Sequence, residues 1–122
     1  MSTRSLIGTV DNEGKCKTIY CHCDGYLEYV GKILKENYPN KEDVEKLFEL
    51  GDLSSLDETP ERCVAYHRDR GEEFNPPSVW KDMNEIVEDA NKSCWAEYIY
   101  LHDGQRWNYY SYHEEEEGWK VL

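Results

Sequence analysis

Apolar and polar residues alternate in two short segments near the N-terminus of this chain. The first is Leu6–Val10, and the turn-forming sequence Asp11–Gly14 separates it from the second, Cys16–His22. This arrangement predicts a β-hairpin. A period of two divides the second strand into two faces. Its first face holds Cys16, Thr18, Tyr20 and His22, and its second holds Lys17, Ile19 and Cys21.

A helical period follows in three later segments. Apolar residues recur every three or four positions over Tyr26–Tyr38, and Pro39 ends this predicted helix. The second helix is predicted to start after Asn40, a typical N-cap, and to end at Gly51. The third is predicted to start at Pro76–Ser78. Its apolar stripe consists of Val79, Met83, Ile86, Val87, Ala90 and Cys94.

The remaining alternating segments predict further strands. They are Arg62–Arg68, Ala96–His102, Gln105–Tyr112 and a short closing strand within Trp119–Leu122. The predicted order is ββααβαββ in a single domain, residues 1–122. Because the strands come mainly as hairpins, we expect an α+β fold with an antiparallel sheet of about five strands. Three helices are expected to pack mainly on one face of that sheet.

Charge is the most pronounced feature of the composition. The 122 residues include 26 acidic and 14 basic side chains, which gives a net charge of −12 and a pI near 4.7. Such a surface repels nucleic acid and anionic membranes, so neither is an expected partner. It attracts a protein with a basic surface, including one that itself binds nucleic acid. The alternative is that the charge serves solubility alone.

The five cysteines favour reduced thiols over disulfides. Their number is odd and their spacing irregular, no signal peptide is apparent, and no apolar run is long enough to span a membrane. The expected location is therefore the cytoplasm. The cluster Cys21–Cys23 invites a zinc interpretation, but Cys21 and His22 point to opposite faces of a strand and no second ligand pair stands out. We expect no metal and no other cofactor.

Two segments read His-x-Asp close to a glycine turn. They are His22–Gly25 and His67–Gly71. If their strands are neighbours, the side chains could orient a general base or bind an anionic ligand through arginine forks. The alternative is that the aspartates only cap turns. The candidate ligand residues are Arg4, His22, Asp24, Tyr66, His67, Arg68, Asp69 and Arg70, and no catalytic motif accompanies them.

The C-terminal region combines aromatic side chains with a run of glutamates. Alternation is expected to turn the aromatic face of these strands outward, as in protein interfaces, although cross-strand packing of the rings is the alternative. The candidate partner-binding residues are Tyr98, Tyr100, Trp107, Tyr109, Tyr110, Tyr112, Glu114, Glu115, Glu116 and Glu117.

Four segments together resemble a family of short, functionally unassigned proteins of bacteriophages and prophages. They are Ser2–Gly8, Ile19–Tyr26, Gly51–Leu56 and Ala65–Glu72, so the resemblance covers about the first 75 residues. It implies a phage context, in which small acidic proteins often act against bacterial defence, as anti-CRISPR proteins do. No residue role is implied by the resemblance.

Three functions follow from these observations. The first is an anti-CRISPR-like interaction protein that inhibits a bacterial defence system in the host cytoplasm by docking on a basic, nucleic-acid-binding effector. The second is a protein that binds or sequesters a nucleotide signal. The third is a small hydrolase that uses the paired His-x-Asp segments. The oligomeric state stays open, with a homodimer as one option.

Overall fold

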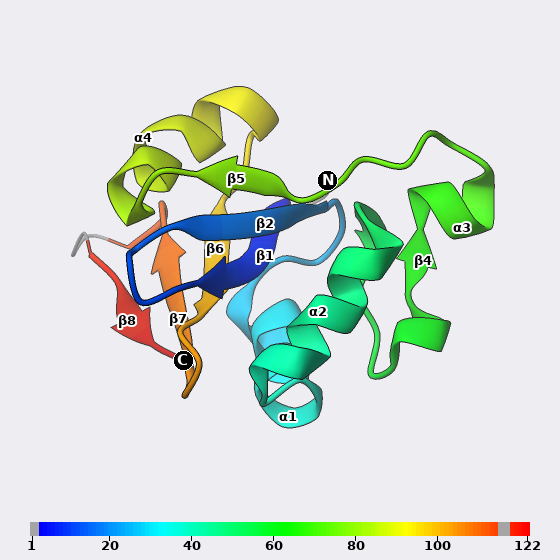
Figure 1. The fold of residues 1–122 in the computed structure, drawn as a ribbon, viewed down its shortest axis with the longest axis horizontal. Coiled ribbons are helices and arrows are strands. Elements are labelled where there is room, and N and C mark those ends of the chain that lie inside the picture. Colours follow the sequence, from blue (N-terminus) through cyan, green and yellow to red (C-terminus); the bar gives the residue numbers. More distant parts are fainter. Residues whose placement is uncertain (1–2, 115–117) are drawn as a thin grey trace.

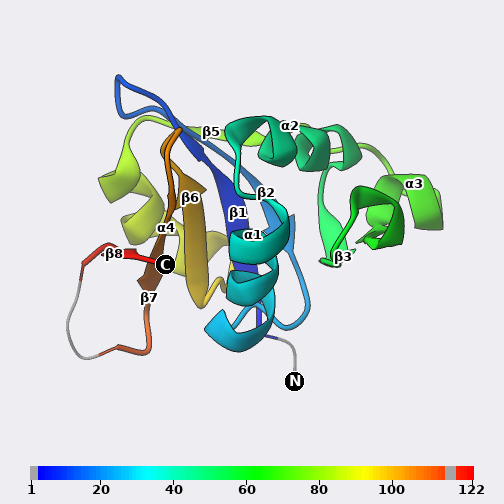
Figure 2. The ribbon, with the colours of Figure 1, turned by 90° about the horizontal axis from the view of Figure 1, so that it is seen from below.

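The computed structural model describes residues 3–114 and 118–122, and within them the chain forms a mixed eight-stranded sheet with helices on both faces (Figures 1 and 2). The strands are β1 (Ser5–Val10), β2 (Cys16–Cys21), β3 (Leu53–Ser55), β4 (Val64–Ala65), β5 (Ser78–Trp80), β6 (Tyr98–His102), β7 (Trp107–Ser111) and β8 (Lys120–Val121). Their order is β4-β3-β2-β1-β6-β7-β8, and β5 pairs with β2.

The helical elements connect these strands. They are the π-helical segment η1 (Leu27–Gly31) continued by α1 (Lys32–Asn37), α2 (Lys41–Leu50), the 3-10 turn η2 (Pro60–Arg62), α3 (Tyr66–Arg70) and α4 (Met83–Cys94). The predicted α+β class is confirmed. Among the described residues no helix has the length and apolar character needed to cross a membrane.

The predicted antiparallel sheet of about five strands, with three helices mainly on one face, is wrong in detail: among the described residues the sheet is mixed and has eight strands, and four α-helices lie on both of its faces. The pairs β1–β6 and β2–β3 are parallel, whereas the other strand pairs are antiparallel. Parallel neighbours need a crossover connection, and β6 reaches β1 after α4. Helices α1 and α2 cover one face, where Leu34 and Val44 pack with Ile7 and Ile19. Helix α4 covers the other, where Ile86 and Ala90 pack.

The second predicted helix has the expected start. Asn40 and Asp43 form a reciprocal capping box, in which the backbone N–H of Asn40 donates to Asp43 Oδ2 at 3.1 Å. Gly51 follows the last residue of α2 and has a positive φ of 78°. Such caps satisfy backbone groups that would otherwise lack partners, which explains why this segment was predictable.

The third predicted helix starts later than its apolar stripe suggests. Ser78–Trp80 is strand β5, and α4 begins after Asp82, whose Oδ1 accepts a hydrogen bond from Glu85 N at 2.9 Å. Val79 therefore lies outside the helix and is 60% exposed. Aspartate is a preferred N-cap, so the cap and not the stripe decides where the helix begins.

The strand predicted at Arg62–Arg68 is also mostly wrong. Within this segment Val64–Ala65 forms strand β4, and the chain then turns into the short helix α3. Asp69 Oδ2 accepts a hydrogen bond from Ala65 N at 2.8 Å, and Gly71 ends the helix with a positive φ of 69°. This hydrogen bond and the left-handed glycine favour a helical turn over the strand that the alternating pattern predicted.

Candidate functional site

The expected aromatic partner surface lies largely in the core. Tyr100, Trp107 and Tyr110 are buried, and Tyr98, Tyr109 and Tyr112 are half-buried. The expectation that this face points away from the helices is wrong, because both faces of β6 and β7 are covered.

Backbone carbonyl groups accept hydrogen bonds from the buried rings of Tyr100 and Trp107. The Tyr100 hydroxyl donates to Gly25 O at 2.6 Å, and Trp107 Nε1 donates to Tyr38 O at 2.7 Å. Burial raises the pKa of Tyr100 far above its usual value, so the hydroxyl stays protonated and can donate. The aromatic residues therefore tie the sheet to the segments on either side of η1 and α1.

The acidic run at the C-terminus is only partly described. Glu114 forms an ion pair with Lys120 and accepts a hydrogen bond from the Tyr109 hydroxyl at 3.1 Å. The bond from Lys120, the bond from Tyr109 and the nearby charge lower the pKa of Glu114. Glu115, Glu116 and Glu117 lie outside the described residues. Glu114 is thus engaged within the chain.

The two His-x-Asp segments each make separate local contacts. His22 Nδ1 lies 2.7 Å from the Tyr20 hydroxyl, whereas His67 Nδ1 lies 2.8 Å from Glu72 O. Strand β3 lies between the two segments, because its Ser54 accepts a hydrogen bond from each side. Each histidine ring thus has a hydrogen-bond partner close to it in the sequence. The convergence that a general base would need is not formed.

The guanidinium of Arg68, next to His67, forms hydrogen bonds within the chain. Arg68 donates to both carboxylate oxygens of Asp69 at 2.9 Å, and also to Pro60 O at 3.1 Å and Cys63 O at 2.7 Å. The hydrogen bond from Arg68 and the bond from the Ala65 backbone lower the pKa of Asp69. These contacts fix the loop before β4 and leave the fork no donor pair for a ligand.

The other predicted ligand residues are dispersed. Arg70 lies 5.3 Å from the Tyr66 ring centroid in a cation–π contact. Asp24 has a positive φ of 56° in the turn before η1, a conformation that aspartate tolerates. Arg4 precedes β1 and lies on the face covered by α4. The eight predicted residues therefore do not form one pocket.

Three of the five cysteines, Cys16, Cys21 and Cys63, are buried. Burial raises the pKa of Cys16 to about 11 and that of Cys21 to about 12. Ionised thiolates are the form that binds metals and reacts, so these two side chains are poorly suited to either role near neutral pH. Within residues 3–114 and 118–122, no group of three or more potential metal ligands is placed to hold an ion.

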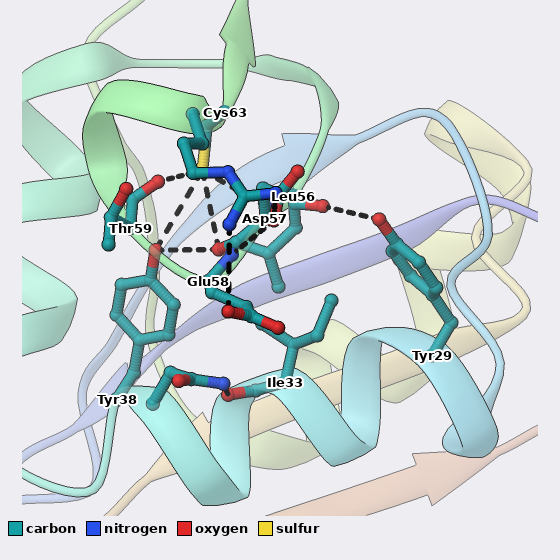
Figure 3. Close-up of polar contacts among 10 residues, drawn as sticks. Tyr29, Ile33, Tyr38, Leu56, Asp57, Glu58, Thr59 and Cys63 are labelled. Atoms are coloured by element: carbon teal, nitrogen blue, oxygen red, sulfur yellow. Dashed lines mark hydrogen bonds and ion pairs between the residues drawn. The ribbon is translucent and has the colours of Figure 1, made fainter.

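An acidic groove is the feature that sequence reasoning missed. It lies between η1–α1 and the segment that follows β3, and its volume is ≈ 290 Å³. Tyr29 and Ile33 contribute apolar surface to it (Figure 3). Its carboxylates are those of Glu28, Glu36, Asp57 and Glu58.

Tyrosine hydroxyl groups and one thiol hold the second wall of this acidic groove in place. The Tyr29 hydroxyl donates to Leu56 O at 3.0 Å, and the Tyr38 hydroxyl donates to Asp57 O at 2.8 Å. Asp57 N donates to Cys63 Sγ at 3.3 Å. Figure 3 shows Tyr29, from η1, and Tyr38, just after α1, both pointing toward this segment. These contacts fix the main chain of Asp57, whose side chain lines the groove and accepts a hydrogen bond at Oδ1 from Glu58 N at 2.7 Å.

In the described part of the chain, Arg62 and Lys32 lie near the acidic groove. Arg62 is 3.8 Å from Asp57 and 3.6 Å from Glu58, and its side chain is 63% exposed. Lys32 is exposed and also lines the groove. Exposed ion pairs of this kind contribute little to the free energy of folding. A cation from another molecule can therefore take the place of Arg62 or Lys32 beside the carboxylates.

Comparisons with known proteins do not assign this chain to a family. No protein-family model matches it. No curated protein and no solved structure matches it either. Its function is therefore argued from its own residues.

Proposed function

We propose that this protein works by binding, and that the acidic groove receives an arginine or lysine side chain of a basic partner protein. The observation that carries the proposal is the convergence of four carboxylates, from η1–α1 and from the segment after β3, on one groove. A net charge of −12 supports it, because long-range attraction speeds the encounter with a basic surface.

The shape of the acidic groove suits one long cationic side chain. Its ≈ 290 Å³ falls just below the volume typical of sites for drug-sized ligands. Tyr29 and Ile33 offer apolar contact to an aliphatic stem, while the carboxylates lie within reach of the charged end. Arginine has the advantage over lysine because its planar guanidinium carries five N–H donors and pairs bidentately with a carboxylate.

The biological setting of the proposal comes from the resemblance to phage proteins. In that setting the partner is a nucleic-acid-binding effector of a bacterial defence system in the host cytoplasm. Occupation of its basic surface by an acidic protein would exclude nucleic acid, because the same arginines and lysines hold phosphates. The protein would then act as an inhibitor of the anti-CRISPR type.

The geometry favours this role over the two alternatives at the His-x-Asp segments. A nucleotide site there requires Arg68, whose donors are already bound to Asp69 and to backbone carbonyls. A hydrolase there requires His22 and His67 to converge, and β3 lies between their segments.

A synthetic octa-arginine peptide tests the acidic groove directly by isothermal titration calorimetry. The variant Glu28→Gln/Glu36→Gln removes two exposed carboxylates from the groove. Its matched control, Glu88→Gln/Asp89→Asn, removes two exposed carboxylates from α4 on the opposite face of the sheet. Exposed pairs contribute about 0.5 kcal/mol each, so the groove variant should bind roughly fivefold more weakly.

The two variants carry the same net charge. A difference between their affinities for the peptide therefore reports the position of the carboxylates and not the overall charge. We expect the control to lose less affinity than the groove variant, and both to bind more weakly as ionic strength rises. Equal losses in the two variants would show that only net charge matters, and the acidic groove would then have no special role.

A further inference from the structure

A second and larger pocket lies on the face of the sheet that α4 covers. Its volume is ≈ 730 Å³, within the range of sites for small ligands. The walls come from β1, β2, β5 and the end of α4, four parts of the chain that the fold brings together. The lining includes Arg4, Tyr20, Asp52, Trp80, Cys94 and Trp95. We call it the Arg4 pocket.

Arg4 is the cation of this pocket. Its Nε is buried and has no hydrogen-bond partner within the described part of the chain. None of the ion pairs formed by those residues includes Arg4. A buried donor without a partner costs free energy, and a charged one costs more. An anion from outside the chain would satisfy this guanidinium.

Trp95 stands on the rim of the Arg4 pocket in a strained conformation. It follows the last residue of α4 with φ 61° and ψ 27°, a left-handed position that glycine normally occupies. The residue is nevertheless 69% exposed, so its ring gains little from burial. A bulky residue held in this conformation without a packing reason points to a functional role.

Trp80 provides a second ring whose orientation is fixed. Its Nε1 donates to Thr18 Oγ1 on the neighbouring strand at 2.9 Å. Val79, next to it on β5, is 60% exposed and also lines the pocket. Two of the exposed large apolar residues of the described chain, Val79 and Trp95, thus meet at this one pocket. Flat apolar groups stack on such surfaces.

Two carboxylates limit the charge that the pocket accepts. Asp52 and Glu85 line it together with Arg4, so a ligand with several negative charges would be repelled. Asp52 itself is occupied, because its Oδ1 accepts from Tyr20 N at 3.0 Å and its Oδ2 from Asn75 at 3.3 Å. Arg4 thus offers its fork to a single anionic group.

We infer that the Arg4 pocket binds a small ligand in which a flat aromatic ring carries one carboxylate. The carboxylate pairs with the Arg4 guanidinium, and the ring lies against Trp80 and Trp95. This site is separate from the acidic groove, and neither proposal depends on the other.

Three naphthalene probes separate the contribution of the aromatic ring from that of the charge in calorimetric titrations of the whole protein. 2-Naphthoate carries ring and carboxylate, 2-naphthamide carries the ring without charge, and 2-naphthyl phosphate carries a larger charge. We expect naphthoate to bind at least about tenfold more tightly than the amide, since charge-assisted forks are strong. The phosphate should bind more weakly than naphthoate. Equal binding of naphthoate and amide, or tightest binding of the phosphate, would overturn the inference.

Two variants locate the site. Arg4→Gln should reduce naphthoate binding to the level of the amide, whereas Arg106→Gln, an exposed arginine in the β6–β7 turn, should not change it. Trp95→Gly removes the ring and suits the left-handed backbone, so it should fold and bind both naphthoate and amide roughly tenfold more weakly. Unchanged naphthoate binding in a folded Trp95→Gly protein would refute the site even if Arg4→Gln does not fold.

Discussion

Replacement of Tyr100 by phenylalanine tests whether the aromatic residues of β6 and β7 act as internal tethers. Tyr100 is fully buried, and its hydroxyl donates to Gly25 O at 2.6 Å. Tyr100→Phe keeps the ring and leaves the buried Gly25 carbonyl without this donor. A buried polar group that loses its partner costs about 1–3 kcal/mol. The free energy of unfolding should fall by that amount.

The expected change in melting temperature follows from the size of the chain. A chain of 122 residues has an entropy of unfolding of about 0.26 kcal/mol/K. The Tm of Tyr100→Phe, measured by scanning calorimetry, should therefore fall by about 4–12 °C. Tyr26→Phe is the matched control, because Tyr26 is 37% exposed and the same change there should alter stability by less than about 0.5 kcal/mol.

A second readout separates a tether from a partner contact. Below its melting temperature, Tyr100→Phe should bind the octa-arginine peptide as well as the original protein does. An unchanged Tm together with weaker binding would refute the reasoning. It would mean that the hydroxyl of Tyr100 faces a partner, as the alternating pattern of the strand suggested.

Three further predictions concern the backbone and the pH dependence of stability. Gly8→Ala should abolish folding or lower the Tm strongly, because a Cβ there would lie 1.7 Å from Lys17 O; an unchanged Tm would contradict the β1–β2 pairing. The urea midpoint of unfolding should be lower at about pH 10 than at about pH 8. The reason is that thiols of the unfolded chain ionise near pH 9, whereas burial holds the folded-state pKa of Cys16 near 11 and that of Cys21 near 12. Their contribution is complete below pH 9 and is lost as the pH rises, so an equal or higher midpoint at the higher pH would count against the burial of these thiols. Trp95→Gly should be more stable than Trp95→Ala by about 1 kcal/mol in urea unfolding, the reverse of the usual order, because only glycine adopts the left-handed conformation without strain.

Local chemistry made much of the secondary structure predictable. The hairpin of β1 and β2 follows from alternation around a turn, and α2 follows from its Asn40–Asp43 capping box. The same kind of signal also explains an error. Asp82 is the N-cap of α4, but the apolar stripe before it suggested an earlier start. Caps locate helix ends better than periodicity does.

The arrangement of the faces was not predictable from the pattern. Alternation along β6 correctly separates Tyr98 and Tyr100 from Ile99 and Leu101. It does not say whether one or both faces are covered. Here α1 packs over the first set and α4 over the second, so a face with polar atoms became part of the core. Backbone acceptors such as Gly25 O made that burial possible.

The acidic groove was hidden from sequence reasoning for a related reason. Glu28 and Glu58 are distant in the chain, and no repeat or spacing connects them. Hydrogen bonds from the hydroxyls of Tyr29 and Tyr38 to main-chain carbonyls bring the two segments together. Such contacts depend on tertiary geometry alone. Without that geometry, exposed glutamates in the sequence cannot be distinguished from an ordinary solvated surface.

The most direct test of the binding proposal uses three versions of the protein as affinity baits in lysate from a bacterium with an active defence system. The baits are the original protein, Glu28→Gln/Glu36→Gln and Glu88→Gln/Asp89→Asn, and mass spectrometry quantifies each captured protein. The account predicts a basic nucleic-acid-binding protein that the first and third baits retain, that salt releases, and that the groove variant fails to retain. Equal retention of that protein on all three baits would contradict the claim that the acidic groove binds it.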